Sequence, residues 1–138
     1  MIDASDLKII RLLLKDSRTP LSKMAEELGI SQPAAQKRVE KLKKKGILVG
    51  STAIINESKI GWKRAIIALN VRRAGYHSLL DLLIKLPLVT AVYQSTGPYA
   101  ITVELLGPSG VVNGVISHIR EMKCVVGFCP ITLVERAI

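Results

Sequence analysis

Aromatic, cysteine and histidine residues are scarce in this chain of 138 residues. Phe, Trp and Tyr make up 4% of it, and only two cysteines and two histidines occur. Cys124 and Cys129 supply neither the four ligands of a structural zinc site nor the density of a secreted disulfide scaffold, so we expect buried, reduced thiols. His77 and His118 stand alone, with no carboxylate or cysteine at ligand or triad spacing, and there is no glycine-rich phosphate loop. The sequence therefore indicates no catalytic residue, metal site or cofactor.

Long apolar runs are lacking, and acidic side chains are few. The longest stretch without a charged side chain, 86–103, contains Pro87 and Pro98, which a membrane-spanning helix of about 20 apolar residues would not tolerate. The chain begins with Asp3 and Asp6 instead of a basic stretch leading into an apolar one, so we expect no signal peptide and a cytoplasmic protein. Acidic residues number 11 against 20 basic ones, a formal charge of +9. This balance favours a polyanionic partner, nucleic acid before an anionic membrane surface.

The residues that are present are those of a globular protein with an aliphatic core. Apolar residues make up 49% and charged residues 22%, a balance that argues against intrinsic disorder. By the usual range of roughly 100–200 residues per domain, the chain holds one domain or two very small ones. This length excludes a large multi-site enzyme.

The first half of the chain has the apolar periodicity of three helices. Asp3 and Asp6 predict an N-cap and an acidic first turn for a helix over 3–15. Gly29 and Ser31 predict the end of a second helix, opened by Thr19-Pro20, and the start of a third. The expected apolar positions are Leu7, Ile10, Leu13 and Leu14 in the first, Leu21, Met24, Ala25 and Leu28 in the second, and Ala35, Val39 and Leu42 in the third. About three residues separate the second helix from the third, which predicts a helix-turn-helix.

The third helix carries the densest positive charge of the chain. Its basic residues, opposed only by Glu40, are Lys37, Arg38, Lys41, Lys43, Lys44 and Lys45. A solvated helix face would explain such a run, and a generic three-helix bundle would show the same periodicities. The preceding helix-turn-helix spacing favours a DNA-recognition helix instead.

The two ends of this helix suit different contacts with DNA. Recognition helices meet bases with their N-terminal residues, so Gln32, Gln36 and Lys37 are candidate base readers, with Pro33 on the same outward side. Glutamine can pair with adenine and lysine with guanine. The lysines Lys41, Lys43, Lys44 and Lys45 are expected along phosphates, which add affinity but no sequence information. Arg38, beside the apolar stripe, can contact DNA or merely pack its stem.

Two short apolar runs follow the third helix. Ile47–Val49 and Ala53–Ile55, on either side of Gly50, predict a two-stranded hairpin and hence a winged helix-turn-helix over residues 1–55. Residues 56–63 are expected to be a linker, with Trp62 as a packing anchor.

The second half has the pattern of an α+β domain over 64–138. Strands are expected over 64–71, 89–96, 100–106 and 127–135, and helices over 78–86 and from a cap at Ser109 to Met122. The order βαββαβ predicts a ferredoxin-like sandwich. Apolar residues stand at both odd and even positions of the strands, as in Ile66 and Ile67, so both faces of the sheet are apolar. This indicates that one face is covered by both helices and the other by a second subunit.

Taken in order along almost the whole chain, these features resemble the Lrp/AsnC family of prokaryotic transcriptional regulators, also called leucine-responsive or feast/famine proteins. The resemblance is carried by Asp3 and Asp6, Asp16 with Arg18, the segment LSKMAEELGISQPAAQKRVEKL from Leu21 to Leu42, Gly46-Ile47 with Gly50 and Ala53, Asn56 with Gly61, Val89, Tyr93 and Thr96-Gly97-Pro98-Tyr99. It implies a dimer formed by the C-terminal sheets, commonly assembled into tetramers or octamers. It also implies an effector domain that binds small molecules, often amino acids, between subunits.

The sequence departs from the family pattern in the proposed effector domain. Ala100 stands where an aspartate usually follows the glycine-x-aromatic turn, and Lys123-Cys124-Val125 replaces a Pro-Gly-Val. Since the aspartate contributes to effector binding or its geometry, its replacement puts an amino-acid response in question. The candidate effector-binding residues are Ser95, Thr96, Gly97, Tyr99 and Ala100.

These observations favour a sequence-specific DNA-binding transcriptional regulator that acts as a dimer or higher oligomer on double-stranded DNA. One alternative is a sirohaem-decarboxylase-like enzyme, since some relatives with this layout act on sirohaem; those are richer in His and Arg. Another is a small-molecule-binding oligomer without specific DNA binding, against which the lysine-rich third helix argues.

Overall fold

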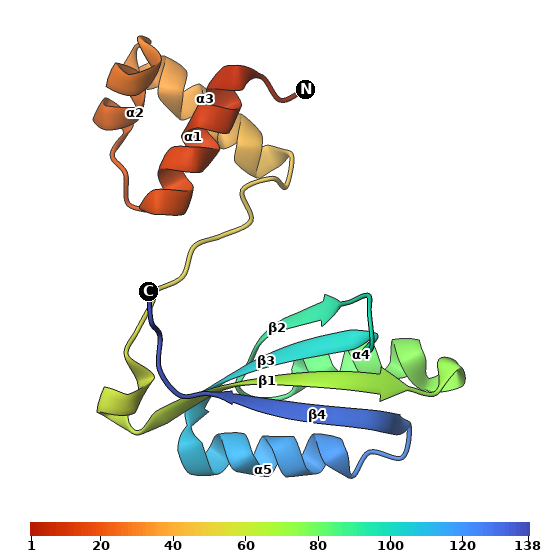
Figure 1. Ribbon diagram of the computed structural model, residues 1–138. Helices are drawn as coiled ribbons and strands as arrows, with labels where there is room; N and C mark the ends of the chain where they lie inside the picture. The colour runs from red at the N-terminus through yellow and green to blue at the C-terminus, as the bar shows by residue number, and fades with distance from the viewer. The chain divides into compact units, whose positions relative to one another are not determined.

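The computed structural model describes residues 1–138 and divides into two units, Met1–Ile54 and Ile55–Ile138. The first unit consists of three helices. They are α1 (Ala4–Lys15), α2 (Leu21–Leu28) and α3 (Gln32–Lys44), shown in red to yellow in Figure 1. The three helices expected from the sequence are thus confirmed, with ends within one or two residues of those expected.

Local signals account for the helix ends. Asp3 caps α1, and Gly29 ends α2 in the left-handed conformation at φ 65°. Ile30 then donates its backbone N–H to the carbonyl of Ala25 at 3.0 Å, which satisfies an otherwise free carbonyl at the helix end. The Ser31 hydroxyl accepts from the Ala34 backbone N–H at 3.2 Å and so begins α3. The turn of the helix-turn-helix is therefore three residues long, as the sequence predicts.

The buried side of α1 differs in part from the expected one: Ile10 and Leu13 pack against the core as expected, but two other positions do not. Ile9 is fully buried, whereas Leu7 is 47% and Leu14 81% exposed. The inner side instead runs through Asp6, Ile9 and Leu13, which share one face at helical spacing, because the Asp6 carboxylate is turned inward. On the other two helices Met24, Ala25, Ala35 and Leu42 are buried and Leu21, Leu28 and Val39 pack against them, as expected.

The hairpin expected after α3 is absent, so the wing prediction is wrong. Residues 47–56 contain no strand, and Val49 is 90% and Ile54 66% exposed. The backbone N–H groups of Ile47 and Leu48 both donate to the carbonyl of Leu42, at 3.0 and 3.2 Å. These residues therefore complete the end of α3, and their backbone N–H groups are not free to pair with a second strand.

The second unit is an antiparallel sheet with two helices on one face (Figure 1). Its strands are β1 (Trp62–Val71), β2 (Val89–Gln94), β3 (Ile101–Pro108) and β4 (Val125–Leu133), in the spatial order β2-β3-β1-β4. The helices are α4 (Tyr76–Lys85) and α5 (Ser109–Arg120), and short 3-10 helices, η1 (Glu57–Ile60) and η2 (Arg73–Gly75), flank β1. The ferredoxin-like βαββαβ order is confirmed.

The core of this unit lies between the sheet and both helices. Its buried residues come from alternate positions of the central strands and from one side of each helix: Ala65, Ile67, Leu69, Ile101, Val103, Leu105, Leu79, Leu83, Val112, Val115, Ile116 and Ile119. The expectation that both helices cover one face is therefore confirmed. No helix of the protein has the length and apolarity needed to cross a membrane.

Three local expectations need correction. Ser109 does not cap α5; it is the first residue of the helix, and its hydroxyl donates to the Gly61 carbonyl at 3.2 Å. The two cysteines are free but only partly buried, because Cys124 lies just before the edge strand β4 and Cys129 within it. Trp62 and Lys63 are the first residues of β1, which pairs from Trp62 opposite Pro108.

The helix-free side of the sheet, here called the open face, carries apolar side chains. Ile66 of β1 lies opposite Ile131 of β4, and Ala68 opposite Cys129. Ile131 is 47% and Leu133 43% exposed. Apolar residues that project from both sides of the strands thus form one buried and one uncovered surface.

Candidate nucleic-acid interface and effector turn

Exposed polar and basic side chains cover the outward side of α3 from its first turn to its last. Gln32 is exposed at the N-terminal end, and a shallow hollow of about 680 Å³ is bordered by Pro33, Gln36, Lys37, Glu40, Lys41, Lys44 and Lys45. Lys37, Lys44 and Lys45 form no ion pair, so their charges face solvent uncompensated. This side of α3 therefore has the charge and length to lie along a polyanion.

Arg38 projects from a different side of α3, toward α1. Its Nη1 donates to both carboxylate oxygens of Asp3, at 2.9 and 2.8 Å, and to Oδ1 of Asp6 at 3.2 Å. Lys41, one turn further along α3, has its Nζ 3.8 Å from Oδ2 of Asp6 and donates to the Met1 carbonyl at 3.3 Å. Of the candidate DNA-contacting residues, these two are paired with side chains at the start of α1.

The charges of this cluster stabilise one another. The hydrogen bond from Arg38, together with one from the Asp6 backbone N–H, lowers the pKa of Asp3 to about 2. The hydrogen bonds to Asp3 and Asp6 in turn raise the pKa of Arg38. Asp6 is 0% exposed, and its carboxylate also accepts from the Asp3 backbone N–H at 3.2 Å. Asp3, Asp6, Arg38 and Lys41, here called the α1–α3 clamp, thus join the start of α1 to the middle of α3.

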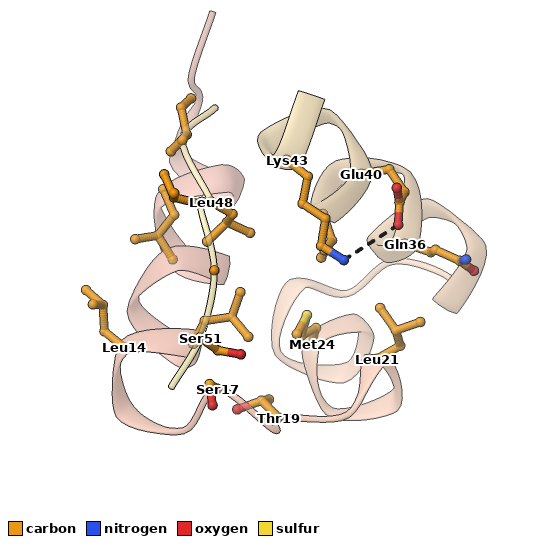
Figure 2. A pocket seen from close by; sticks show the side chains of 16 residues that line it. Leu14, Ser17, Thr19, Leu21, Met24, Gln36, Glu40, Lys43, Leu48 and Ser51 are labelled. Carbon is orange, nitrogen blue, oxygen red and sulfur yellow. Dashed lines mark ion pairs between the residues drawn. The ribbon is translucent and has the colours of Figure 1, made fainter. Parts of the chain in front are cut away.

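Lys43 is paired on the surface beside a second hollow of the first unit. Its Nζ is 3.9 Å from Oε1 of Glu40, and both side chains stand at the edge of this hollow (Figure 2). The hollow, of about 1010 Å³, is lined mainly by apolar residues of all three helices and of segment 47–51. Glu40 therefore offsets Lys43 in part, whereas Lys44 has no such partner.

Hydrogen bonds brace residues 95–100, the turn between β2 and β3 that contains the candidate effector residues. The Ser95 hydroxyl donates to the Tyr99 carbonyl at 2.9 Å and accepts from the Thr102 hydroxyl at 3.1 Å. Thr96 and Gly97 are exposed at the tip, while Tyr99 and Ala100 are partly buried. The structure thus brings the five candidates together in one turn, with the Ser95 hydroxyl already bonded inside it.

Asn70 in β1 holds the other side of this turn. Its Nδ2 donates to the Pro98 carbonyl at 2.7 Å, and its Oδ1 accepts from the Ala100 backbone N–H at 3.0 Å. Sequence reasoning missed this residue, although a signal was present: Asn70 is the one polar residue in the apolar run 65–71. A polar side chain in such a run calls for a hydrogen-bonding partner when it is partly buried.

Sequence reasoning also missed an ion-pair cluster on the open face. Arg64 in β1 lies 2.8 Å from Glu57 of η1 and pairs with Glu104 of β3, and each side chain is about one quarter exposed. No signal in the sequence links these positions, since their pairing depends on the strand register. No group of three or more His, Cys, Asp or Glu side chains is arranged to hold a metal ion.

Comparisons with known proteins agree with this layout. Residues 2–43 match the family model of the AsnC-type helix-turn-helix domain. The HTH-type transcriptional regulator LrpA of Pyrococcus horikoshii is 32% identical over 99% of both chains. The solved structure of E. coli AsnC superimposes with a TM-score of 0.73 at 26% identity, over 100% of this chain and 95% of that one. A Neisseria meningitidis transcriptional regulator solved as an L-Met complex has the same fold, with a TM-score of 0.78 at 16% identity, over 100% of this chain and 93% of that one.

A helix-turn-helix unit with an exposed basic third helix, followed by a ferredoxin-like unit, defines a DNA-binding transcriptional regulator. The match to LrpA over almost the full length identifies the family of regulators. The chain belongs to the Lrp/AsnC family of transcriptional regulators. The relatives named above regulate transcription and are not enzymes, so the alternative of a sirohaem-decarboxylase-like enzyme is set aside.

Proposed function

We propose that this protein is a sequence-specific regulator that inserts α3 into the major groove of DNA. One observation carries the proposal: Lys37, Lys44 and Lys45 are exposed and unpaired on the side of α3 whose N-terminal end presents Gln32 and Gln36. Helix-turn-helix proteins read bases with the first turns of the second helix, which assigns the base contacts to the two glutamines and Lys37. Lys44 and Lys45 then neutralise phosphates. Lys43 adds to the positive field, and Pro33 borders the groove-facing surface.

Binding to its own upstream DNA, compared with a shuffled duplex, tests this function. Fluorescence anisotropy is measured from about 50 to 200 mM salt, because phosphate contacts lose affinity steeply over that range. The proposal expects affinity for the upstream DNA at least roughly 10³-fold above the control near physiological salt. Equal, salt-labile binding to both duplexes would contradict specific regulation at its own promoter. No binding to either would favour an oligomer whose DNA-binding unit is passive.

We also propose that two copies of the chain meet through the open face. Ile131 and Leu133 would otherwise leave apolar surface in water beside Ile66 and Ala68, and monomers seldom expose large apolar patches. A symmetric dimer would require an inverted repeat in DNA, with half-sites about 34–36 Å or a multiple of that apart. Light scattering after gel filtration should give twice the chain mass of 15.0 kDa, or a multiple of the dimer. Ile131→Asp should dissociate it, whereas the exposed helix residue Leu82→Asp serves as the control.

A third proposal concerns turn 95–100, which we assign as an effector site for an amino acid. The L-Met complex of the Neisseria regulator supports this ligand class, and the bracing by Asn70 supports a turn of fixed shape. Ala100 supplies no carboxylate for an α-amino group, so we expect weaker binding than an aspartate would give. Thermal shifts with each of the twenty amino acids test the site, with Thr96→Ala as the variant. A shift that Thr96→Ala leaves unchanged, or no shift at millimolar ligand, would contradict it.

The cellular site follows from the DNA-binding function. A regulator of prokaryotic transcription acts where the chromosome is, so we place this protein in the cytoplasm. Fractionation of cells that express it should recover it with the nucleoid at low salt and release it at high salt.

A further inference from the structure

The α1–α3 clamp contains two of the cations that the sequence places on the DNA-binding helix. Arg38 contacts two carboxylates, and Lys41 lies 3.8 Å from the fully buried Asp6. For either cation to neutralise a phosphate, it would have to leave these partners. Departure of Arg38 would leave a buried carboxylate without its closest cation, which is strongly unfavourable.

The clamp also has the geometry to set the orientation of α3. Asp3 and Asp6 lie one turn apart at the beginning of α1, and each also caps that helix through a backbone N–H, at 2.8 and 3.2 Å. Arg38 and Lys41 lie one turn apart in α3. Together with the apolar packing of Ala35, Val39 and Leu42, two points of attachment on each helix restrict rotation of α3 about its axis. Rotation about that axis decides whether Gln32, Gln36 and Lys37 face the bases.

We propose that Arg38 and Lys41 are positioning residues, which hold α3 in the orientation for base reading and do not neutralise phosphates. The inference rests on the proposed DNA-binding function and adds a division of labour within α3. Arg38 faces α1, and Lys41, at the border of the outward side, is directed to Asp6 of α1, whereas Lys37, Lys44 and Lys45 have no acidic partner and face DNA. A side chain that positions the helix affects sequence discrimination without changing the number of phosphate contacts.

The salt dependence of DNA binding separates the two roles. Each phosphate contact contributes about 0.9 to the slope of log affinity against log salt concentration. Wild type, Arg38→Gln and Lys41→Gln are titrated on a duplex that the wild type selects from a random pool and on a shuffled one, with Lys44→Gln as the matched control. We expect the slope to fall by about 0.9 for Lys44→Gln and to stay at the wild-type value for the other two. We expect the ratio of affinities for the selected and shuffled duplexes to fall about ten-fold for Arg38→Gln, the value of roughly one base contact.

A second variant covers the case in which Arg38→Gln unfolds. Asp6→Asn/Arg38→Gln removes the buried charge together with its cation, so it should fold, keep the wild-type salt slope and still lose discrimination. Unfolding alone lowers the fraction of active protein and leaves the affinity ratio of the folded fraction unchanged. The Lys41 side chain is 44% exposed, and Lys41→Gln leaves the contacts of Arg38 in place, so we expect this variant to fold.

Each outcome has a distinct meaning. A slope reduced by about 0.9 in Arg38→Gln, in the double variant or in Lys41→Gln would show that the replaced cation contacts phosphate and would overturn the inference. An unchanged affinity ratio in the Arg38 variants would overturn it as well. If wild type selects no duplex, the proposed DNA-binding function itself fails, independently of the clamp.

Discussion

Gly127 lies opposite Asn70 across β4 and β1, and a Cβ on Gly127 would stand 3.0 Å from the Cβ of Asn70. A side chain at this position would therefore require the Asn70 side chain to shift by a few tenths of an ångström. From its observed place the Asn70 amide reaches Pro98 and Ala100 in the turn between β2 and β3. Gly127 of the edge strand β4 thus packs directly against the residue that is hydrogen-bonded to turn 95–100.

Gly127→Ala is expected to destabilise the second unit by about 1–3 kcal/mol, because the new methyl group displaces Asn70. Asn70→Ala should cost a similar amount through its two lost hydrogen bonds. Since both changes release the same turn, the double variant should cost less than the sum of the two. Urea unfolding followed by fluorescence of Trp62, the single tryptophan, measures the free energy of this unit. Strict additivity would contradict the link between Gly127 and the turn.

A glycine in α5, unlike Gly127, has room for a side chain. Gly114 lies in the middle of that helix, and a Cβ there would meet nothing within 4 Å. Gly114→Ala should therefore stabilise the second unit by about 0.5–1 kcal/mol, because alanine loses less conformational freedom on folding. Loss of stability in the same urea experiment would mean that this side of α5 is covered in the assembled protein.

Gly29, at the end of α2, has a backbone conformation that favours glycine. Its φ of +65° is left-handed, and open space surrounds the position. Gly29→Ala should therefore cost about 1 kcal/mol for backbone strain alone, without a steric clash. Gly50→Ala, at a position with equal space and no positive φ, should leave the stability unchanged. Circular dichroism at 222 nm during thermal unfolding compares the two, and equal effects would contradict the conformational explanation.

Signals of this kind explain why the helices of the first unit could be predicted. Asp3, Gly29 and Ser31 act on neighbours within a few residues, so their effect can be inferred directly from the sequence. The exposed side of α1 could not be predicted, because it depends on the pairing of Asp6 with Arg38, 32 residues away. Apolar spacing alone placed Leu7 and Leu14 on the inner side.

In the second unit, too, the elements could be predicted from local patterns, whereas the contacts between distant residues could not. The order of strands and helices followed from apolar patterns and turn residues, and that order leaves few topologies to choose from. The contacts of Asn70 with turn 95–100 span 28 and 30 residues, and they depend on strand register. The hairpin after α3 failed for a related reason, since the backbone of Ile47 and Leu48 was taken up by the end of α3.

The Asp3 carboxylate gives the α1–α3 clamp a defined pH dependence. Arg38 lowers its pKa in the folded protein to about 2 from the ordinary value of 3.8. The contribution of Asp3 is therefore fully present above pH 3.8 and is lost as the pH falls toward about 2. Asp3→Asn keeps a capping oxygen but removes the charge, so it should melt below wild type at pH 5–7, and the gap should close near pH 2. A gap in melting temperature that stays constant from pH 5 to pH 2 would contradict the ion pair.

The proposed division of α3 into a base-reading end and a phosphate-binding end makes the most direct functional prediction. Gln36→Ala should remove about 1–3 kcal/mol of discrimination at one base position, because its amide can pair with only some base edges. Lys44→Ala should weaken binding to all duplexes alike and reduce the salt slope by about one unit, since phosphates are the same in every sequence. Titrations of both variants on the upstream duplex and on its shuffled control measure the two effects side by side. Parallel losses on both duplexes for both variants would contradict the assignment, because a base reader cannot lose affinity equally for DNA it reads and DNA it does not.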